Sequence, residues 1–313
     1  MTRTPSSAPL RSDTSREPRT TSYAVLGPGG VGGLLAAVLA RQGHRVTCIA
    51  REQTVEQLQT HGIQVSSSLF GDFTATVDAA PSLDRPVDAC FVATKATALT
   101  EALPRIPPAA VGDALVIPLL NGIDHVAALR RDYEPATVVA GVIHVESTRV
   151  APGVIEQASP FARVSLASDT AAAERIRRVA DDLTAGGFEV VTDLDEPTIL
   201  WSKLSFLATL ALLTTRYRAT AGEVRTAHHD ELVATAREVA AVSGASGGPS
   251  DPGPILDFVD RFRAEGKSSM LRDRESGRAL ELDAIGGAVL RAADTHGIPV
   301  PTVRGLVEAL RDA

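Results

Sequence analysis

The sequence predicts an α/β protein, in which a domain with a mostly parallel sheet precedes an all-helical domain. From Tyr23 onward, short apolar or β-branched runs alternate with amphipathic segments, which is the pattern of strand-helix units in a parallel sheet. From Pro197 to the C-terminus only helical periodicity is found. The length of 313 residues also fits two domains, at roughly 150 residues each.

The strands of the first domain are expected to be covered on both faces, because several of them are apolar almost throughout. A helix over 31–42 is predicted to follow the first strand. The predicted strands span residues 23–26, 45–50, 88–94, 114–120 and 138–142.

After His144 the pattern changes, and two alternating runs flank Pro152-Gly153. These runs predict an antiparallel hairpin that closes the edge of the sheet. Two further strands are predicted over 162–166 and 188–192. The acidic segment before Pro197 then indicates a domain boundary near Asp195.

The chain therefore divides into three parts. A tail over 1–21, rich in Ser, Thr, Pro and Arg, is expected to be disordered. The sheet-containing domain spans 22–195, and the helical domain spans 196–313. Within the helical domain, the Gly- and Pro-rich segment 244–254 predicts a loop between helices, with a mobile lid as the alternative.

Charge and cysteine content exclude several classes of function. With 31 Lys and Arg against 38 Asp and Glu, the net charge of −7 provides no positive field to hold a nucleic acid. Cys48 and Cys90 lie in apolar runs that predict buried strands, which favours neither disulfides nor a thiolate metal site. We expect a cytoplasmic protein that binds neither nucleic acid nor membrane. A homodimer is compatible with the sequence.

A glycine-rich motif follows the first predicted strand and opens the first helix. Gly27, Gly29 and Gly32 fit G-x-G-x-x-G, so the backbone at Gly30 and Val31 can approach a pyrophosphate at the positive end of a helix. In a strand-helix-strand unit this motif predicts a Rossmann-type domain that binds a dinucleotide. The alternative is a simple strand-helix turn with no ligand.

Arg51 stands at the end of the second predicted strand, where enzymes that use NAD commonly carry an acidic residue for the ribose. A cation at this position favours the 2′-phosphate of NADPH. The alternative is that Arg51 is a solvated loop residue and that Glu52 binds the ribose.

Two charged residues fall on apolar helical faces. Lys203 shares its face with apolar neighbours in ILWSKLSFLATLALLTT, so it either enters a cleft, where a lowered pKa suits proton donation, or extends to solvent. Glu281 falls inside the apolar stripe of a helix predicted over 280–295. It either faces a ligand or serves the helix dipole.

Lys95 and Asn121 each follow a predicted parallel strand, where open α/β sheets form their ligand crevice. Either residue could instead belong to a turn, and Asn121-Gly122 is typical of one. Ser268-Ser269 precedes an apolar pair and could cap a helix. We expect no metal site, because the seven histidines show no metal-ligand spacing. A G-x-S-x-G elbow and a Walker A lysine are also missing.

Taken together, these motifs resemble those of the ketopantoate reductases (2-dehydropantoate 2-reductases), from Tyr23 nearly to the C-terminus. The shared motifs, in order, are GPGGVGG, TKA with Lys95, LNGI with Asn121, WSKL with Lys203, SSMLRD, LELD with Glu281, and HGIPVPT. The resemblance implies NADPH-dependent reduction of a small 2-keto acid in a cleft between the two domains.

The resemblance also implies roles for single residues. Lys203 is similar to the family's general acid, and Glu281 to the carboxylate that orients the substrate hydroxyl. Ser269 matches the residue that contacts the substrate carboxylate. Lys95 and Asn121 match the residues beside the nicotinamide, which touch both cofactor and substrate.

The chain departs from the family at Leu207 and Ala211, where the family usually has asparagines one and two helical turns beyond the lysine. The loss of two amides makes the pocket more apolar and disfavours a hydroxylated substrate. Three alternatives to ketopantoate reduction therefore remain. They are reduction of a more apolar carbonyl compound, an opine- or imine-type reduction that needs an amine, and dinucleotide binding without reduction.

Overall fold

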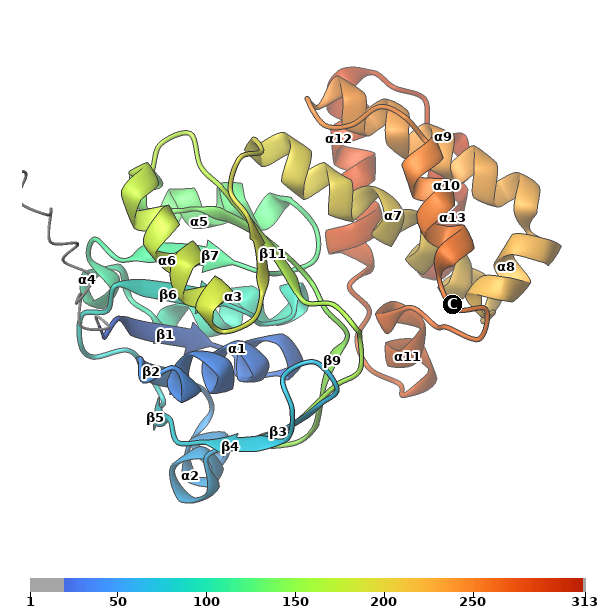
Figure 1. Cartoon of the computed structure of the whole chain (residues 1–313). Coiled ribbons are helices and arrows are strands. Elements are labelled where there is room, and N and C mark those ends of the chain that lie inside the picture. Colours follow the sequence, from blue (N-terminus) through green and yellow to red (C-terminus); the bar gives the residue numbers. More distant parts are fainter. Residues whose placement is uncertain (1–19, 312–313) are drawn as a thin grey trace, which may run out of the picture.

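The computed structural model describes residues 20–311, which form two lobes (Figure 1). Five strands form the central sheet of the first lobe, and every neighbouring pair is parallel. Their spatial order is β5 (Asp78–Ala80), β2 (Arg45–Ile49), β1 (Ser22–Leu26), β6 (Ala89–Val92) and β7 (Leu115–Pro118). The chain runs outward from β1 and returns to β6, so the ligand crevice of such a sheet lies beyond the carboxyl ends of β1 and β6.

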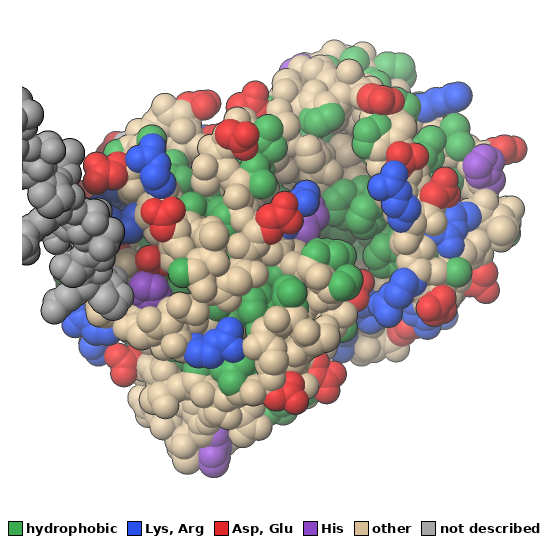
Figure 2. All heavy atoms as spheres, viewed as in Figure 1, with side chains coloured by type: hydrophobic (Ala, Val, Ile, Leu, Met, Phe, Trp, Pro, Cys, Tyr) green, Lys and Arg blue, Asp and Glu red, His purple; other side chains and the backbone are tan. Residues whose placement is uncertain are grey.

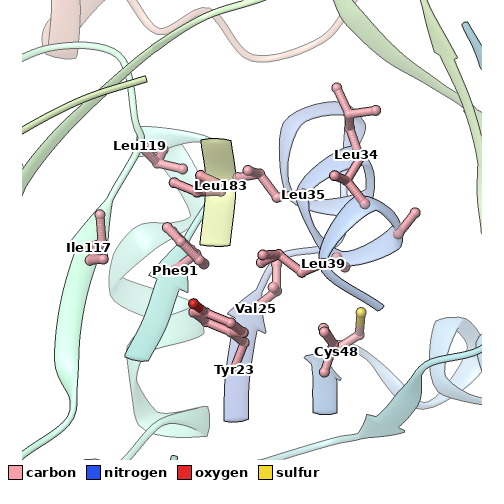
Figure 3. Close-up of a cluster of buried hydrophobic side chains, with 14 of the residues drawn as sticks. Tyr23, Val25, Leu34, Leu35, Leu39, Cys48, Phe91, Ile117, Leu119 and Leu183 are labelled. Carbon is pink, nitrogen blue, oxygen red and sulfur yellow. The ribbon is translucent and has the colours of Figure 1, made fainter. Parts of the chain in front are cut away.

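Alternating side chains of the central strands build two separate cores. Tyr23 and Val25 point to one face, where they pack with Phe91 and with leucines of α1 (Gly30–Arg41) (Figure 3). Ala24 and Leu26 point to the other face and pack with residues of several further helices. Both faces of the sheet are thus covered, as the unbroken apolar runs predict.

Helices and short turns connect the strands of this lobe. The α-helices after α1 are α2 (Glu52–His61), α3 (Leu99–Ala102), α4 (Pro108–Val111), α5 (Asp124–Asp132) and α6 (Ala173–Ala185). Residues of α6 join α1 on one face of the sheet, whereas residues of α3, α4 and α5 lie in the core of the other face.

The predicted hairpin at Pro152-Gly153 forms, but it does not close the edge of the central sheet. Its strands belong to a second sheet with the order β4 (Phe73–Ala75), β3 (Ile63–Ser67), β10 (Val154–Gln157) and β9 (Ser147–Ala151). The sequence reasoning missed the short strands β3, β4 and β5. Because β3 offers a free edge, β10 pairs with it in parallel.

The strand expected over 138–142 begins two residues later. Val138 makes only an isolated bridge to Val116 of β7, and the chain then changes partner. The resulting third sheet has the order β12 (Glu189–Val191), β11 (Arg163–Ala167) and β8 (Ala140–His144). This shift places His144 at the carboxyl end of β8.

The second lobe is helical throughout its described residues, as predicted. Its long central helix is α7 (Glu196–Tyr217), which packs against most of the others. The remaining helices are α8 (Ala221–Ala227), α9 (His229–Ala245), α10 (Gly253–Arg261), α11 (Ser269–Glu275), α12 (Ala288–His296) and α13 (Pro301–Arg311). By length and composition α7 could span a membrane, but about two thirds of its apolar window is buried, as in the core helix of a soluble protein.

Three sequence predictions concern the boundaries of these lobes. Residues 1–19 of the expected tail lie outside the described residues, whereas Thr21 is buried and its hydroxyl donates to Asp182. At the expected domain boundary, the Asp195 carboxylate caps α7. The segment expected to be a loop over 244–254 is shorter, because α9 and α10 extend into it, and Gly248 lies against Trp201.

Candidate active site

The glycine-rich turn forms a cradle at the start of α1. Gly27 has φ +84°, a conformation that favours glycine, and a Cβ there would meet Thr94 at 2.8 Å. A Cβ at Gly32 would lie 2.3 Å from the Gly27 carbonyl oxygen, so this glycine permits close packing of helix against strand. At Gly29 a Cβ would face open space, with its nearest neighbour 4.0 Å away. The turn therefore leaves room for a ligand at one glycine and uses the other two for packing.

The N-terminus of α1 carries no side-chain cap. The amides of Gly30 and Val31, at the first two helical positions, lie where a helix end binds anions. Gly30 is also pinned against β9, because a Cβ there would lie 2.2 Å from the Ser147 carbonyl oxygen. The buried hydroxyl of Thr94, beside Gly27, has no hydrogen-bond partner among the described residues. These features fit a dinucleotide phosphate group.

Arg51 lies immediately before α2, at the carboxyl end of β2 and on the same sheet edge as the glycine cradle. Its side chain is 72% exposed and its guanidinium is 3.0 Å from Glu101. Glu52 occupies the first turn of α2. Arg51 is thus free to turn toward a ligand, at the cost of a solvent-exposed ion pair of small energy.

Glu281 joins the two lobes. The residue is 6% exposed, and its carboxylate accepts hydrogen bonds from the Ala96 amide at 2.9 Å and from the Asn121 side-chain amide at 2.9 Å. The expected helix over 280–295 begins after Glu281, with a π-helical turn over Asp283–Gly287. Glu281 is therefore not part of an apolar helical stripe. It precedes the helix and reaches the strand ends of the other lobe.

Lys95 and Asn121 both lie at the strand ends and both contact the helical lobe. The Lys95 ammonium is 2.5 Å from the carboxylate of Asp273, which is buried and also accepts from Arg278 at 2.8 Å. Asn121 binds Glu281, and Gly122, with φ +90°, lies against the Ala284 carbonyl group. Asn121-Gly122 therefore forms a turn and also contacts the helical lobe.

Lys203 lies on α7 and is partly buried. Within residues 20–311 it forms no ion pair with an acidic side chain, and the Glu281 carboxylate acts on it through space. Loss of hydration lowers the pKa of Lys203 to about 8, while the Glu281 carboxylate acts to raise it. Lys203 thus belongs to a cleft between the lobes and does not extend freely into solvent. An ammonium group with this pKa can release a proton near neutral pH.

Two histidines that the sequence reasoning did not select lie near Lys203. Burial lowers the pKa of His125 to about 4, and the Lys203 charge adds to the effect. The same causes, with Arg163, lower the pKa of His144 to about 4. Each ring has one buried nitrogen without a partner among the described residues. The position of His144 at a strand end, as for Lys95 and Asn121, was the available signal.

Ser268 and Ser269 have different environments. The Ser268 hydroxyl caps α11 through the Leu271 amide and contacts the Thr214 hydroxyl at 2.8 Å. Ser269 follows in the first turn of α11 and is partly exposed. Of the two positions with lost asparagines, Leu207 is partly exposed, whereas Ala211 is fully buried in the helical core.

The first lobe is of the Rossmann type and has a glycine cradle with open space at Gly29. A lysine and a carboxylate of the helical lobe face it, which is the architecture of two-domain dinucleotide-dependent oxidoreductases. Comparison with known proteins agrees with this class. Residues 23–168 match the model of the ketopantoate reductase PanE/ApbA, and residues 197–313 match that of its C-terminal domain. The chain belongs to the ketopantoate reductase family and is an oxidoreductase.

Individual relatives cover nearly the whole chain. A 2-dehydropantoate 2-reductase from Caulobacter vibrioides is 30% identical over 304 residues, 94% of this chain and 99% of that protein. The crystal structure of a 2-dehydropantoate 2-reductase from Geobacter metallireducens has a TM-score of 0.84, is 25% identical, and covers 93% and 99% of the two chains. A D-mandelate dehydrogenase solved with NADH and anilino(oxo)acetate has a TM-score of 0.83 at 19% identity, covering 93% and 97%.

Proposed function

We propose that this protein reduces a 2-keto acid to the 2-hydroxy acid, with NADPH as the reductant. The observation that carries the proposal is the environment of Lys203, whose pKa is lowered to about 8 beside the Glu281 carboxylate. A lysine with this pKa can hold a proton at pH 7 and give it up to an alkoxide. A ketopantoate-like acid is the substrate that the family resemblance implies.

The reaction needs a hydride and a proton. When bound, NADPH would be held through its pyrophosphate at the glycine cradle and would supply the hydride to the carbonyl carbon. Lys203 gives its proton to the carbonyl oxygen, and solvent restores that proton. Glu281 would orient the hydroxyl that results, Ser269 would contact the substrate carboxylate, and Lys95 and Asn121 would hold the nicotinamide and the substrate.

Arg51 supports the choice of NADPH over NADH. Its exposed guanidinium at the end of β2 can pair with a 2′-phosphate, and a phosphate would form stronger, bidentate contacts than Glu101 does. The D-mandelate dehydrogenase of the same fold was solved with NADH. The two cofactors must therefore be compared directly on this chain.

The test follows NADPH absorbance with the purified full chain and a set of 2-keto acids, repeated with NADH. Lys203→Ala should lower turnover at least about 100-fold while NADPH binding, measured by fluorescence, is kept. In the unmodified protein kcat/KM should fall as the pH rises above 8, because Lys203 must be protonated to act as the acid.

Lys267→Ala, at a half-exposed lysine paired with Glu275, is the matched control and should leave turnover unchanged. Near-native turnover of Lys203→Ala would remove the lysine from its proposed role. Faster turnover with NADH would overturn the NADPH assignment and leave the reductase assignment standing. Tight NADPH binding without oxidation over the whole set would favour a binding protein, and turnover only after an amine is added would favour an imine reductase.

A further inference from the structure

A row of aromatic side chains leads away from Lys203. Phe206 of α7 packs against Phe258 of α10 with their ring centroids 4.0 Å apart, and Phe258 lies 5.8 Å from Phe262. All three rings are partly exposed. We define these residues, Phe206, Phe258 and Phe262, as the phenylalanine wall.

The wall begins at the catalytic lysine. Phe206 follows Lys203 by three residues on the same helix, so both side chains lie on neighbouring parts of one helical face. The ring of His144 lies 5.6 Å from that of Phe206, and the charge of Lys203 acts on the pKa of His144. Lys203, His144 and Phe206 are therefore close neighbours in the cleft.

The wall ends at a contact between the two lobes. Glu146 follows His144 by two residues, Arg263 follows Phe262 directly, and their side chains form an ion pair at 3.2 Å. Both side chains are exposed, so this pair marks the outer end of the wall. Figure 2 shows a hollow between the lobes, with hydrophobic side chains on its floor and charged side chains at its rims.

Side chains near the wall offer little to a hydroxylated substrate. Leu207, one turn beyond Lys203, is partly exposed and offers no hydrogen-bonding group. A substrate hydroxyl placed against leucine and phenylalanine would lose its hydrogen bonds to water and gain none. An aromatic ring or a branched alkyl group would instead gain buried apolar area and contact with the rings.

We propose that the phenylalanine wall selects 2-keto acids whose side chain is aromatic or branched and carries no hydroxyl. The proposal rests on the proposed function, because it concerns the substrate of that same reaction. Phe206 and Phe258 bind the group attached to the keto carbon, while Ser269 and Lys203 hold the carboxylate and the carbonyl oxygen. Phe206 and Phe258 are then specificity residues.

The first arm of the test uses a pair of substrates that differ by a single hydroxyl. Ketopantoate and 3,3-dimethyl-2-oxobutanoate have the same branched carbon, and only the former carries the terminal hydroxyl. We expect kcat/KM to be at least about tenfold higher for the compound without it. Phenylglyoxylate should likewise exceed pyruvate by at least about tenfold, because its ring contacts the wall.

The second arm removes the wall. Phe258→Ala should lower kcat/KM for phenylglyoxylate at least about tenfold and leave that for pyruvate within about twofold, since pyruvate is too small to reach the ring. Phe161→Ala, at a 48% exposed phenylalanine in the first lobe, is the control and should change neither value. Thermal unfolding of each variant reports whether the fold is kept.

The results separate the two proposals. Reduction of ketopantoate faster than its deoxy analogue would overturn the selection and leave the reductase assignment standing. An equal loss for phenylglyoxylate and pyruvate in a folded Phe258→Ala would also overturn it, because the ring would then be structural. Reduction of no keto acid would overturn both proposals.

Discussion

The two sides of the cleft, which the proposed function assigns to the cofactor and to the substrate, are built in different ways. On the proposed cofactor side the pyrophosphate site is made of backbone, from one short turn and one helix end, and it needs glycines because a Cβ would clash or fill the ligand's space. Arg51 adds a side chain at the neighbouring strand end. The substrate side is made of charged and polar side chains that come from both lobes and meet only in the folded protein. The difference teaches that one half of the cleft is set by local conformation and the other half by the way the lobes pack.

The largest effect is expected at Glu281, where the two lobes meet. Glu281→Ala leaves the Ala96 amide and the Asn121 side chain without their partner, and each lost bond to a charged group costs about 1–3 kcal/mol. We expect kcat/KM to fall about 100-fold or more, with a lower unfolding free energy in urea. Glu308→Ala, at an exposed glutamate of α13, is the control. Unchanged activity would show that packing alone positions the substrate side.

An intermediate effect is expected for the glycine cradle, where two alanine substitutions should separate packing from binding. Gly32→Ala forces a Cβ to within 2.3 Å of the Gly27 carbonyl oxygen, so the unfolding free energy should fall by about 1–3 kcal/mol. Gly29→Ala adds a methyl group in open space, so stability should change by less than about 0.5 kcal/mol. Its dissociation constant for NADPH should nonetheless rise about tenfold, because the methyl group fills the ligand's space.

Fluorescence titration and urea unfolding of the two variants give both quantities. A Gly29→Ala protein that binds NADPH as tightly as the parent would mean that the pyrophosphate does not approach this glycine. The cofactor side would then not be a backbone site at all, and the contrast between the two halves of the cleft would be lost.

The smallest effect concerns acid stability and the buried histidine of α5. The pKa of His125 is about 4 in the folded protein against 6.5 unfolded, so the unfolded chain binds more protons between these values. Stability from this group is present above pH 6.5 and is lost as the pH falls toward 4. At pH 4.5 the loss is about 2 kcal/mol relative to pH 7. His125→Gln should remove this part of the pH dependence.

Urea unfolding of the parent and of His125→Gln at pH 7 and pH 4.5 measures this contribution. His61→Gln, at an exposed histidine, is the control, and its unfolding free energy should depend on pH as that of the parent does. An equal loss of unfolding free energy between pH 7 and pH 4.5 in the parent and in His125→Gln would mean that His125 is hydrated in the folded protein. The surroundings of Lys203 would then be more hydrated than its lowered pKa indicates.

The sequence predicted the parts of this protein that are recorded in local patterns. The parallel sheet, the glycine turn and the helical second lobe follow from apolar runs and periodicity. The pairing of β10 with β3 could not be predicted, because strands of three to five residues carry too little periodicity to fix a partner. The predicted place of Glu281 within the helix over 280–295 was also wrong, because the helix begins one residue after it. The π-helical turn over Asp283–Gly287 departs from the 100° spacing on which that prediction relied.

The candidate site likewise contains residues that a local sequence pattern indicates and residues that no local pattern indicates. Lys95 and Asn121 were predicted because strand ends are visible in a sequence, and both contact the helical lobe. His144 was missed because its strand was placed two residues too early, which hid its position at a strand end. Asp273, the buried partner of Lys95, is far from it in sequence, and no local signal connects them.

The double contact of Glu281 gives this protein a way to couple motion to chemistry. Any movement that opens the cleft must withdraw this carboxylate from the Ala96 and Asn121 amides and expose it to water. Loss of hydration is the larger cause of the lowered pKa of Lys203, and this carboxylate only opposes it, so parting the lobes would rehydrate the ammonium group and raise its pKa. We therefore expect Lys203 to release a proton more readily when the lobes are together than when they part.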